Sequence, residues 1–321
     1  MRSGIETTAM TRGPEPQLGI VPEPADAAHF LVLRVRDHVC NAREVGRQLS
    51  AIPALMAELD PGERLAANVG IGPEFWDALS PGRRPAGLRP FRALAADGRR
   101  APSTGGDVLL HVSSARRDLT FDLLLQARTR LGDQVEVLED VAAFRRFEAR
   151  DLTGFIDGTE NPKDDARAEW ALVGDDDAPF AGGSYVFTQR YVHDLKRWAE
   201  APLKEQEGAI GRRKRDSKQL SEKSTPPTAH ISRVVIEEPG PDGSPAELEI
   251  FRRSAPWGTV TEHGLYFVAF SADPTRFDKM LAKMFGTTGD GLHDRLTDFS
   301  RPVSGSYYFA PSLESLAALG E

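Results

Sequence analysis

The first half of this 321-residue chain alternates strand-like runs with helical patterns, and this order limits the fold more than any other feature. The strand-like runs are short and rich in apolar and β-branched residues, and they lie at 30–35, 107–114 and 135–141. Asn41, followed by Glu44, resembles a capping box and predicts a helix that continues to Leu59. Residues 115–131 form a second amphipathic pattern. The predicted order is strand, helix, strands, helix, strand.

The second half repeats this order. Its strand-like runs lie at 183–192, 233–237, 249–254, 264–271 and 306–312. A helical segment with Trp198 follows the first run, and Asp273 before Pro274 predicts the start of another helix. The glycine-rich segment 286–291 follows a helix rather than a strand, so we predict a turn there and not a nucleotide-binding loop.

Two βαββαβ units predict an α+β protein made of two ferredoxin-like domains. We expect a flexible leader at 1–19, an N-terminal domain at 20–150 and a C-terminal domain at 151–321. Two domains of roughly 100 to 200 residues each fit this length. Because edge strands of ferredoxin-like units often pair, a homo-oligomer is also expected.

The composition excludes several classes of protein and site. Cys40 is the single cysteine, which rules out a disulfide framework and a four-cysteine zinc site, and fits the cytoplasm. The first twenty residues lack the apolar segment of a secretory signal, and no apolar run is long enough to span a membrane. The net charge of −8 disfavours nucleic acid as a partner. The basic run 211–223 contains Asp216 and Glu222, so we predict a solvated loop.

The most informative stretch is GFIDGTENP, residues 154–162. Further blocks follow it: YVFTQRYVHDL (185–195), IGRRKRDS (210–217), a histidine at 230, IFRRSAPWG (250–258), GLYFVAF (264–270) and DRLTDFSRPVSGSYYFAPS (294–312). In this order the blocks resemble those of the dye-decolourising peroxidases, and most of all the bacterial B-type branch. The resemblance covers residues 16–314, nearly the whole chain.

The resemblance implies two ferredoxin-like domains of the dimeric α+β barrel type, with one haem b per chain held mainly by the C-terminal domain. His230 matches the family's proximal iron ligand. A neutral imidazole leaves the opposite axial position of the iron open and donates electron density that helps O–O cleavage. Such an imidazole usually donates its second N–H to an acceptor. Asp294 is the expected acceptor, with Asp298 as the alternative.

Asp157 and Arg252 match the family's distal residues, on the other side of the haem. A carboxylate there can move a proton between the oxygens of peroxide, and a guanidinium can stabilise charge on the leaving oxygen. Gly158, with Gly154, would let the backbone approach the porphyrin, although Gly158 could instead supply only a tight turn beside a capping Asp157. Ser254 is expected on the haem side, where many B-type relatives have asparagine.

Several other residues have two interpretations. Glu160 and Asn161 are candidates for the haem edge, or only cap a turn. Arg253 should point away from the haem as a surface or salt-bridge residue. Core packing explains the aromatic residues better than a relay of oxidising equivalents does; these are Trp170, Trp198, Trp257, Tyr307 and Tyr308.

The implied function is reduction of hydrogen peroxide with one-electron oxidation of phenolic, dye-like or other small aromatic donors. One alternative is a haem carrier or an iron-release, deferrochelatase-like protein on the same scaffold. Another is a non-catalytic assembly protein without haem. Asp157 and Arg252 favour turnover, and His230 argues against loss of the haem. Neither a membrane nor nucleic acid is expected as a partner.

Overall fold

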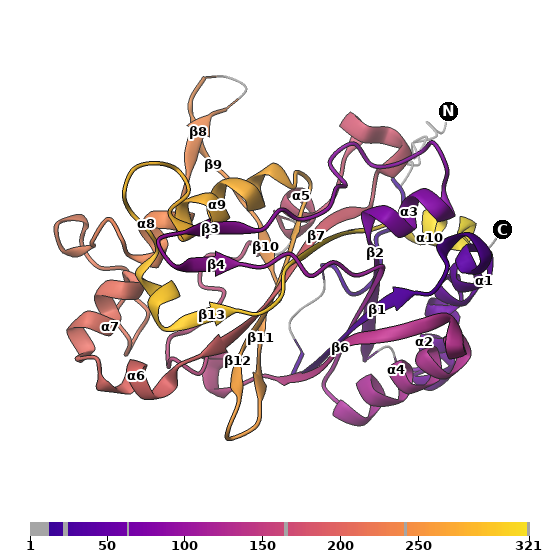
Figure 1. Cartoon of the computed structure of the whole chain (residues 1–321), viewed down its shortest axis with the longest axis horizontal. Helices are drawn as coiled ribbons and strands as arrows, with labels where there is room; N and C mark the ends of the chain where they lie inside the picture. The colour runs from indigo at the N-terminus through magenta and orange to yellow at the C-terminus, as the bar shows by residue number, and fades with distance from the viewer. Residues whose placement is uncertain (1–12, 22–24, 63, 164–165, 241–242, 320–321) are drawn as a thin grey trace, which may run out of the picture.

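The computed structural model describes residues 13–21, 25–62, 64–163, 166–240 and 243–319 (Figure 1). Two units with the same strand order make up the fold. Antiparallel pairing gives the order β6-β1-β5-β2 in the first unit and β11-β12-β7-β14 in the second. Both are the strand order of a ferredoxin-like unit, so the predicted fold class is confirmed.

The strands and helices of the first unit occur in the predicted order. They are β1 (Ala27–Val35), α1 (His38–Ser50), α2 (Ile52–Leu59), β2 (Leu65–Ile71), α3 (Pro73–Leu79), β3 (Leu94–Ala96), β4 (Arg99–Ala101), β5 (Val108–Ser114), α4 (Arg117–Leu131) and β6 (Val135–Phe144). Helices α1, α2 and α4 gather at one end of the molecule (Figure 1).

The second unit has a longer connection between its first two strands, and this connection carries several short helices. Its elements are α5 (Ala166–Ala171), β7 (Ser184–His193), α6 (Leu195–Glu200), α7 (Leu203–Ile210), α8 (His230–Val234), β8 (Glu237–Pro239), β9 (Pro245–Glu247), β10 (Phe251–Arg252), β11 (Ala255–Gly258), β12 (His263–Ser271), α9 (Thr275–Phe285), β13 (Ser300–Pro302), β14 (Ser306–Ala310) and α10 (Leu313–Ala318). Helices α6, α7 and α8 lie at the end of the molecule opposite α1, α2 and α4 (Figure 1).

The two units pair with each other and close eight strands into a ring. Trp257 of β11 bridges Ala143 of β6, and Phe309 of β14 bridges Ile71 of β2. The edge strands of each unit therefore meet the other unit of the same chain. This removes the reason given above for expecting a homo-oligomer, because those edges are no longer offered to a second copy.

Alternate residues of each strand enter two different cores, as a pleated strand requires. In β1, Phe30 and Val32 point into the ring, where they pack with Tyr266 and Val268 from the second unit. Leu31, Leu33 and Val35 point outward to a core that is shared with the covering helices. Burial on both faces explains why the strand-like runs are continuous apolar stretches.

Three predictions of local structure are wrong. Helix α1 begins at His38, and its cap is the Asp37 side chain, which accepts from the Cys40 amide; the helix then breaks at Ala51. Pro53, which lacks an amide proton, lies in the first turn of the new helix. The predicted strand 233–237 is not a strand for most of its length, because α8 extends to Val234 and β8 begins only at Glu237.

The other errors concern residues expected at the surface. The described part of the predicted flexible leader is bound to the body: Gln17 is 2% exposed, and its side chain bonds to Val69 and to the Pro311 carbonyl. The first twelve residues lie outside the described part of the chain. Arg253 does point away from Arg252, but it is buried, and it donates to the Gly19 carbonyl and to Ser113 Oγ. Its position inside the ring was not expected from an alternating strand pattern.

Candidate active site

A cavity of about 300 Å³ lies on the helix-facing side of the second unit's sheet. Ligand pockets of proteins begin at about this size. The sheet contributes Phe187, Leu265 and Phe267 to its wall, and α9 contributes Met280 and Leu281. Against this apolar wall stand a few polar side chains, and these include most of the predicted site residues.

His230, the first residue of α8, faces the cavity and is held by a buried carboxylate. Its Nδ1 lies 2.6 Å from Asp294 Oδ2, and Asp294 is fully buried. The other carboxylate oxygen of Asp294 accepts from the Leu296 amide at 2.9 Å, which fixes the carboxylate. Asp298, the alternative acceptor, bonds instead to His293 and Arg295. With Nδ1 held in this way, Nε2 is the nitrogen left to bind a metal.

Asp157 and Arg252 come from separate segments and line the same cavity. Burial is the largest influence on Asp157 and raises the pKa of its carboxyl group, while the nearby positive charge of Arg252 opposes that change. The Nε atom of Arg252 is buried and has no hydrogen-bond partner among the described residues. A donor without a partner inside a cavity is suited to a bound ligand.

Asn161 fixes the backbone that carries Arg252. Its Nδ2 donates to the Arg252 carbonyl at 2.8 Å, and the Arg252 amide donates to its Oδ1 at 3.1 Å. The turn that contains Asp157 is thereby bound to strand β10 by two hydrogen bonds. Asn161 is not among the residues that line the cavity, so its contact is with Arg252 rather than with the cavity.

The remaining predicted residues have more varied positions. Gly158 has a φ of 75°, which suits a turn, and its amide donates to Asp157 Oδ1 at 2.8 Å. A Cβ on Gly154 would meet Lys214 rather than the cavity, so the predicted role of Gly154 in approaching a porphyrin is wrong. Glu160 lines the cavity and forms an ion pair with Arg212. Ser254 Oγ is buried, has no partner among the described residues, and lies outside the lining.

The sequence did not reveal a second histidine in the cavity wall. His193 Nε2 lies 3.1 Å from Asp151 Oδ1, and its Nδ1 lies 2.8 Å from Ser300 Oγ. Burial acts to raise the pKa of Asp151, but the bonds from His193 and Thr153 outweigh it and lower the pKa to about 2. The negative charge on Asp151 also helps to raise the pKa of Asp157. Since Asp151, His193 and Ser300 are far apart in sequence, no local motif could have indicated this group.

The residues that line the cavity fit a haem. The wall is apolar, and one imidazole is held by a buried carboxylate so that its second nitrogen is left for iron. Arg212 adds a positive charge at the wall, which is suitable for the carboxylates of a porphyrin. No group of three or more histidine, cysteine, aspartate or glutamate side chains arranged to hold a metal ion occurs among the described residues.

The chain matches the models of both domains of one protein family. The model of the Dyp-type peroxidase C-terminal domain matches residues 148–315, and that of the N-terminal domain matches residues 17–145. The chain belongs to the Dyp-type peroxidase family. The predicted family is thus confirmed over almost the same part of the chain that carried the resemblance.

Individual relatives agree with this assignment. A dye-decolorizing peroxidase of Rhodococcus erythropolis is 38% identical over 307 residues, which cover 93% of this chain and 89% of the relative. One of Mycobacterium tuberculosis is 37% identical over 90% of this chain and 86% of the relative. A variant of DypB from Rhodococcus jostii, solved in complex with heme, has a TM-score of 0.90 at 38% identity, covering 95% of this chain and 99% of that one.

Proposed function

We propose that this Dyp-type peroxidase is a haem b enzyme that reduces hydrogen peroxide and oxidises small organic donors, with His230 as the iron ligand and Asp157 and Arg252 as the residues that act on peroxide. The observation that carries the proposal is the apolar cavity with the Asp294-bound imidazole of His230 in its wall, together with Asp157 and Arg252. The heme in the DypB structure supports the choice of cofactor.

Haem would supply an iron that binds peroxide and stores its two oxidising equivalents. The residues of this chain supply the rest. His230 binds through Nε2, and Asp294 orients the imidazole and increases its basicity by accepting from Nδ1. Arg212, which lines the cavity, is placed to pair with a porphyrin carboxylate, and Glu160 limits its movement through their ion pair.

Asp157 acts on protons. As a carboxylate it would accept a proton from one oxygen of peroxide and return it to the other, so that the second oxygen could leave as water. Burial raises the pKa of this carboxyl group, which makes the carboxylate a stronger base for accepting the proton. The bond from the Gly158 amide to Oδ1 leaves Oδ2 available for peroxide.

Arg252 stabilises the charge that develops on the departing oxygen. Its Nε has no partner among the described residues, so a hydrogen bond to peroxide would not require an existing bond to break. Asn161 holds the Arg252 backbone and so keeps the guanidinium in register with Asp157. Ser254 remains a candidate for a further hydrogen bond near the cavity.

A haem carrier or iron-release protein is the second candidate. A deferrochelatase of Escherichia coli is 24% identical over 284 residues, which cover 77% of this chain and 65% of the relative. The dye-decolorizing peroxidases of Rhodococcus erythropolis and Mycobacterium tuberculosis are more similar, at 38% and 37% identity. Asp157 and Arg252 also favour turnover of peroxide, since a carrier does not require an acid–base pair over the iron.

Absorption spectra of the protein loaded with haem test the proposal. We expect the wild type to show a Soret band that changes on addition of peroxide, and the original band should return on addition of a phenol. His230→Ala should lose either the haem or the spectral features of an imidazole-bound iron. Asp294→Asn should weaken haem retention about 10- to 100-fold. A Soret band that does not respond to peroxide would indicate the carrier instead. A spectrum unchanged by His230→Ala would refute the assignment of the ligand.

We also propose a cytoplasmic location and a homo-oligomeric assembly, each supported by a separate observation. The exposed free thiol of Cys40 supports a cytoplasmic location, where thiols stay reduced. No helix in the described ranges is both long enough and apolar enough to cross a membrane.

The proposed homo-oligomer is supported by two exposed apolar side chains on α4, Phe121 and Leu125. They lie one helical turn apart and are 53% and 51% exposed, and a second copy of the chain would cover them. Sedimentation of Phe121→Asp against the wild type tests the last point.

A further inference from the structure

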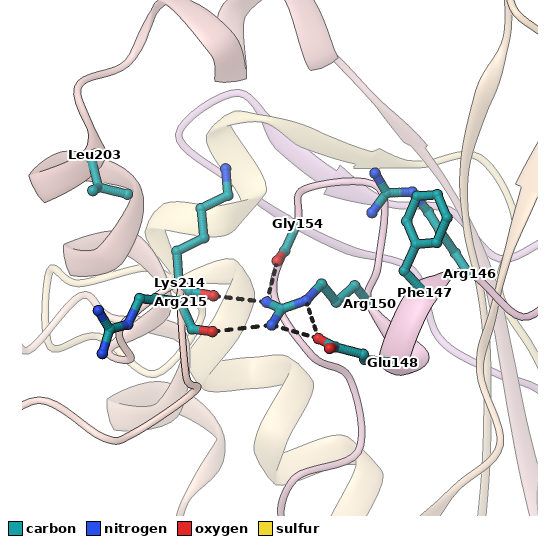
Figure 2. Close-up of a pocket in the computed structure, with 8 residues that line it drawn as sticks. All are labelled: Arg146, Phe147, Glu148, Arg150, Gly154, Leu203, Lys214 and Arg215. Atoms are coloured by element: carbon teal, nitrogen blue, oxygen red, sulfur yellow. Dashed lines mark hydrogen bonds and ion pairs between the residues drawn. The ribbon is translucent and has the colours of Figure 1, made fainter.

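A second, open pocket lies at Gly154, three residues before Asp157 in the chain (Figure 2). Gly154 lines this pocket, and the next residue, Phe155, lines the main cavity. Four basic side chains and one acidic side chain belong to its wall: Arg146, Arg150, Lys214, Arg215 and Glu148. In a chain of net charge −8, a pocket with three more positive than negative groups is a local exception. We refer to it as the basic pocket.

Arg150 stabilises the wall of the basic pocket, and its charge is already paired. Its guanidinium pairs with Glu148 at 2.9 Å and donates to the carbonyls of Gly154, Lys214 and Arg215 at 2.9, 2.7 and 3.1 Å (Figure 2). These bonds hold the loop at Gly154 against the segment of Lys214 and Arg215. They also neutralise the single carboxylate of the wall.

Among the described residues the other three basic side chains form no ion pair with a carboxylate, although Glu207 lies near Lys214 and favours its charged form. Lys214 Nζ donates to Gln206 Oε1 at 2.6 Å, and burial together with Arg146 and Arg150 lowers the pKa of its ammonium group. Arg215 is exposed, and its side chain has no partner among the described residues. Arg146 donates to the Asp151 carbonyl with one nitrogen only. An anion in the basic pocket would relieve the repulsion among these groups.

The basic pocket also has apolar sides. Phe147 and Leu203 stand at opposite ends of it and are 76% and 57% exposed (Figure 2). The Arg146 guanidinium lies 5.0 Å from the centre of the Phe147 ring. Glu148 and Ala149, which follow Phe147, have φ values of 50° and 60°, and non-glycine residues adopt such values at a cost that is often associated with binding sites. A flat aromatic ligand could contact Phe147 or Leu203 while its anionic group meets the cations.

From this arrangement we propose that the basic pocket binds a small aromatic anion, such as an aromatic carboxylate or sulfonate, and so favours anionic donors among the substrates of the enzyme. Its role for donors rests on the proposed peroxidase function, whereas the binding itself does not. The ammonium of Lys214 lies 5.6 and 5.9 Å from the ring centres of Phe155 and Trp198. Since Lys214 lines the basic pocket and Phe155 lines the main cavity, the contact between these two side chains connects the two pockets.

Calorimetric titration of the haem-loaded protein without peroxide tests binding directly. The probes are naphthalene-2-sulfonate, its uncharged sulfonamide and inorganic sulfate. We expect the sulfonate to bind at least about tenfold more tightly than either of the others. Arg215→Gln should weaken the sulfonate about fivefold, the upper range for one exposed ion pair, and Leu203→Asp should weaken it further. The matched control is Lys218→Gln, which removes the same charge from an exposed residue of the same segment outside the pocket.

The outcomes separate the proposal from its alternatives. Equal weakening by Lys218→Gln and Arg215→Gln would show a general charge effect and overturn the proposal. Sulfate that binds as tightly as the sulfonate would show a plain anion site and overturn the aromatic part. In steady-state assays, Arg215→Gln should lower kcat/KM for a sulfonated phenol relative to an uncharged phenol. If no phenol is oxidised at all, the peroxidase proposal fails while the titration still decides whether the basic pocket binds.

Discussion

The two units share one strand order, but the space between sheet and helices differs: in the second unit it holds a cavity, and in the first unit it is packed with apolar side chains. In the first unit, Leu33 and Val69 point outward from the sheet into a continuous core with Val45 of α1 and Leu123 of α4. In the second unit, the corresponding side of the sheet presents Phe187, Tyr191, Leu265 and Phe267 to the cavity. The same topology thus produces a filled core in one half and a ligand site in the other.

The difference arises from the connection between the first two strands of each unit. Residues 36–64 connect β1 with β2 and contain α1 and α2, which have 13 and 8 residues and pack on the sheet. Residues 194–250 connect β7 with β10, but α6, α7 and α8 have only 6, 8 and 5 residues. Such short helices cover little of a sheet, and the space that they leave uncovered is where His230 faces inward. A ligand site therefore required a longer connection rather than a new topology.

The largest expected effect distinguishes two adjacent arginines: Arg252 lines the cavity, whereas Arg253 lies inside the ring and bonds to residues of the first half. Arg252→Leu should slow the reaction with peroxide by about 10² to 10³, because it removes a donor that stabilises developing charge, while the haem is retained. Arg253→Leu should instead lower the free energy of unfolding by about 2 kcal/mol, because its bonds inside the ring are lost. Stopped-flow spectroscopy and urea unfolding measure the two effects. A slow peroxide step in Arg253→Leu alone would reverse the assignment.

The next effect compares the filled core with the cavity. Leu33→Ala should reduce the free energy of unfolding of the haem-free protein by about 3 kcal/mol, because Leu33 is fully buried and a new void forms. Leu281→Ala removes the same atoms beside an existing cavity, so the loss should be closer to about 2 kcal/mol. Chemical denaturation of both variants checks the difference. Equal losses would mean that the cavity is closed when haem is absent.

A third effect concerns acid stability. Asp151 has its pKa lowered to about 2 in the folded protein, so its stabilising effect is complete above the ordinary value of 3.8 and is lost as the pH falls toward 2. A change of nearly two units corresponds to about 2 kcal/mol. Asp151→Asn should therefore be less stable than the wild type at pH 6, and the gap should narrow between pH 4 and pH 2. Leu33→Ala is the control, since its loss should not depend on pH.

The smallest effect is a shift in a pH profile. Asp157 must be ionised to accept a proton, so the rate of the peroxide step should fall as the pH falls through its pKa. That pKa is raised above the ordinary value for aspartate by burial and is held down in part by Arg252. The midpoint should accordingly lie above 3.8 in the wild type and move still higher in Arg252→Leu. A midpoint that moves to lower pH in that variant would contradict the proximity of the two groups.

The sequence predicted the parts of the fold that depend on local pattern. Continuous apolar runs such as 30–35 became strands buried on both faces, because the ring and the outer helices cover them. The predicted strand at 233–237 is wrong because its β-branched residues favour a strand, whereas the spacing of the apolar residues favours a helix. Ile231, Val234 and Val235 line the cavity at helical intervals, and that interval was the signal available in the sequence.

The candidate site was predictable where one block of sequence carries a residue type with a clear chemical use. His230, Asp157 and Arg252 were predicted from the resemblance of their blocks to the family, and Asp294 was preferred to Asp298 by its place in a block; the structure places the first three around one cavity. The group formed by Asp151, His193 and Ser300 could not be found, because its members meet only after the strands pair. The burial of Arg253 had the same cause, since the ring interior is formed by both halves.

Closure of the ring through Trp257 with Ala143 and through Phe309 with Ile71 has a consequence for the folding of each half by itself. A half expressed alone would expose two strand edges, together with side chains such as Phe30 or Tyr266 that now face the opposite half. Each half is therefore expected to associate with a copy of itself or to aggregate unless the other is present. Co-expression of the two halves as separate chains should restore a soluble complex that takes up haem.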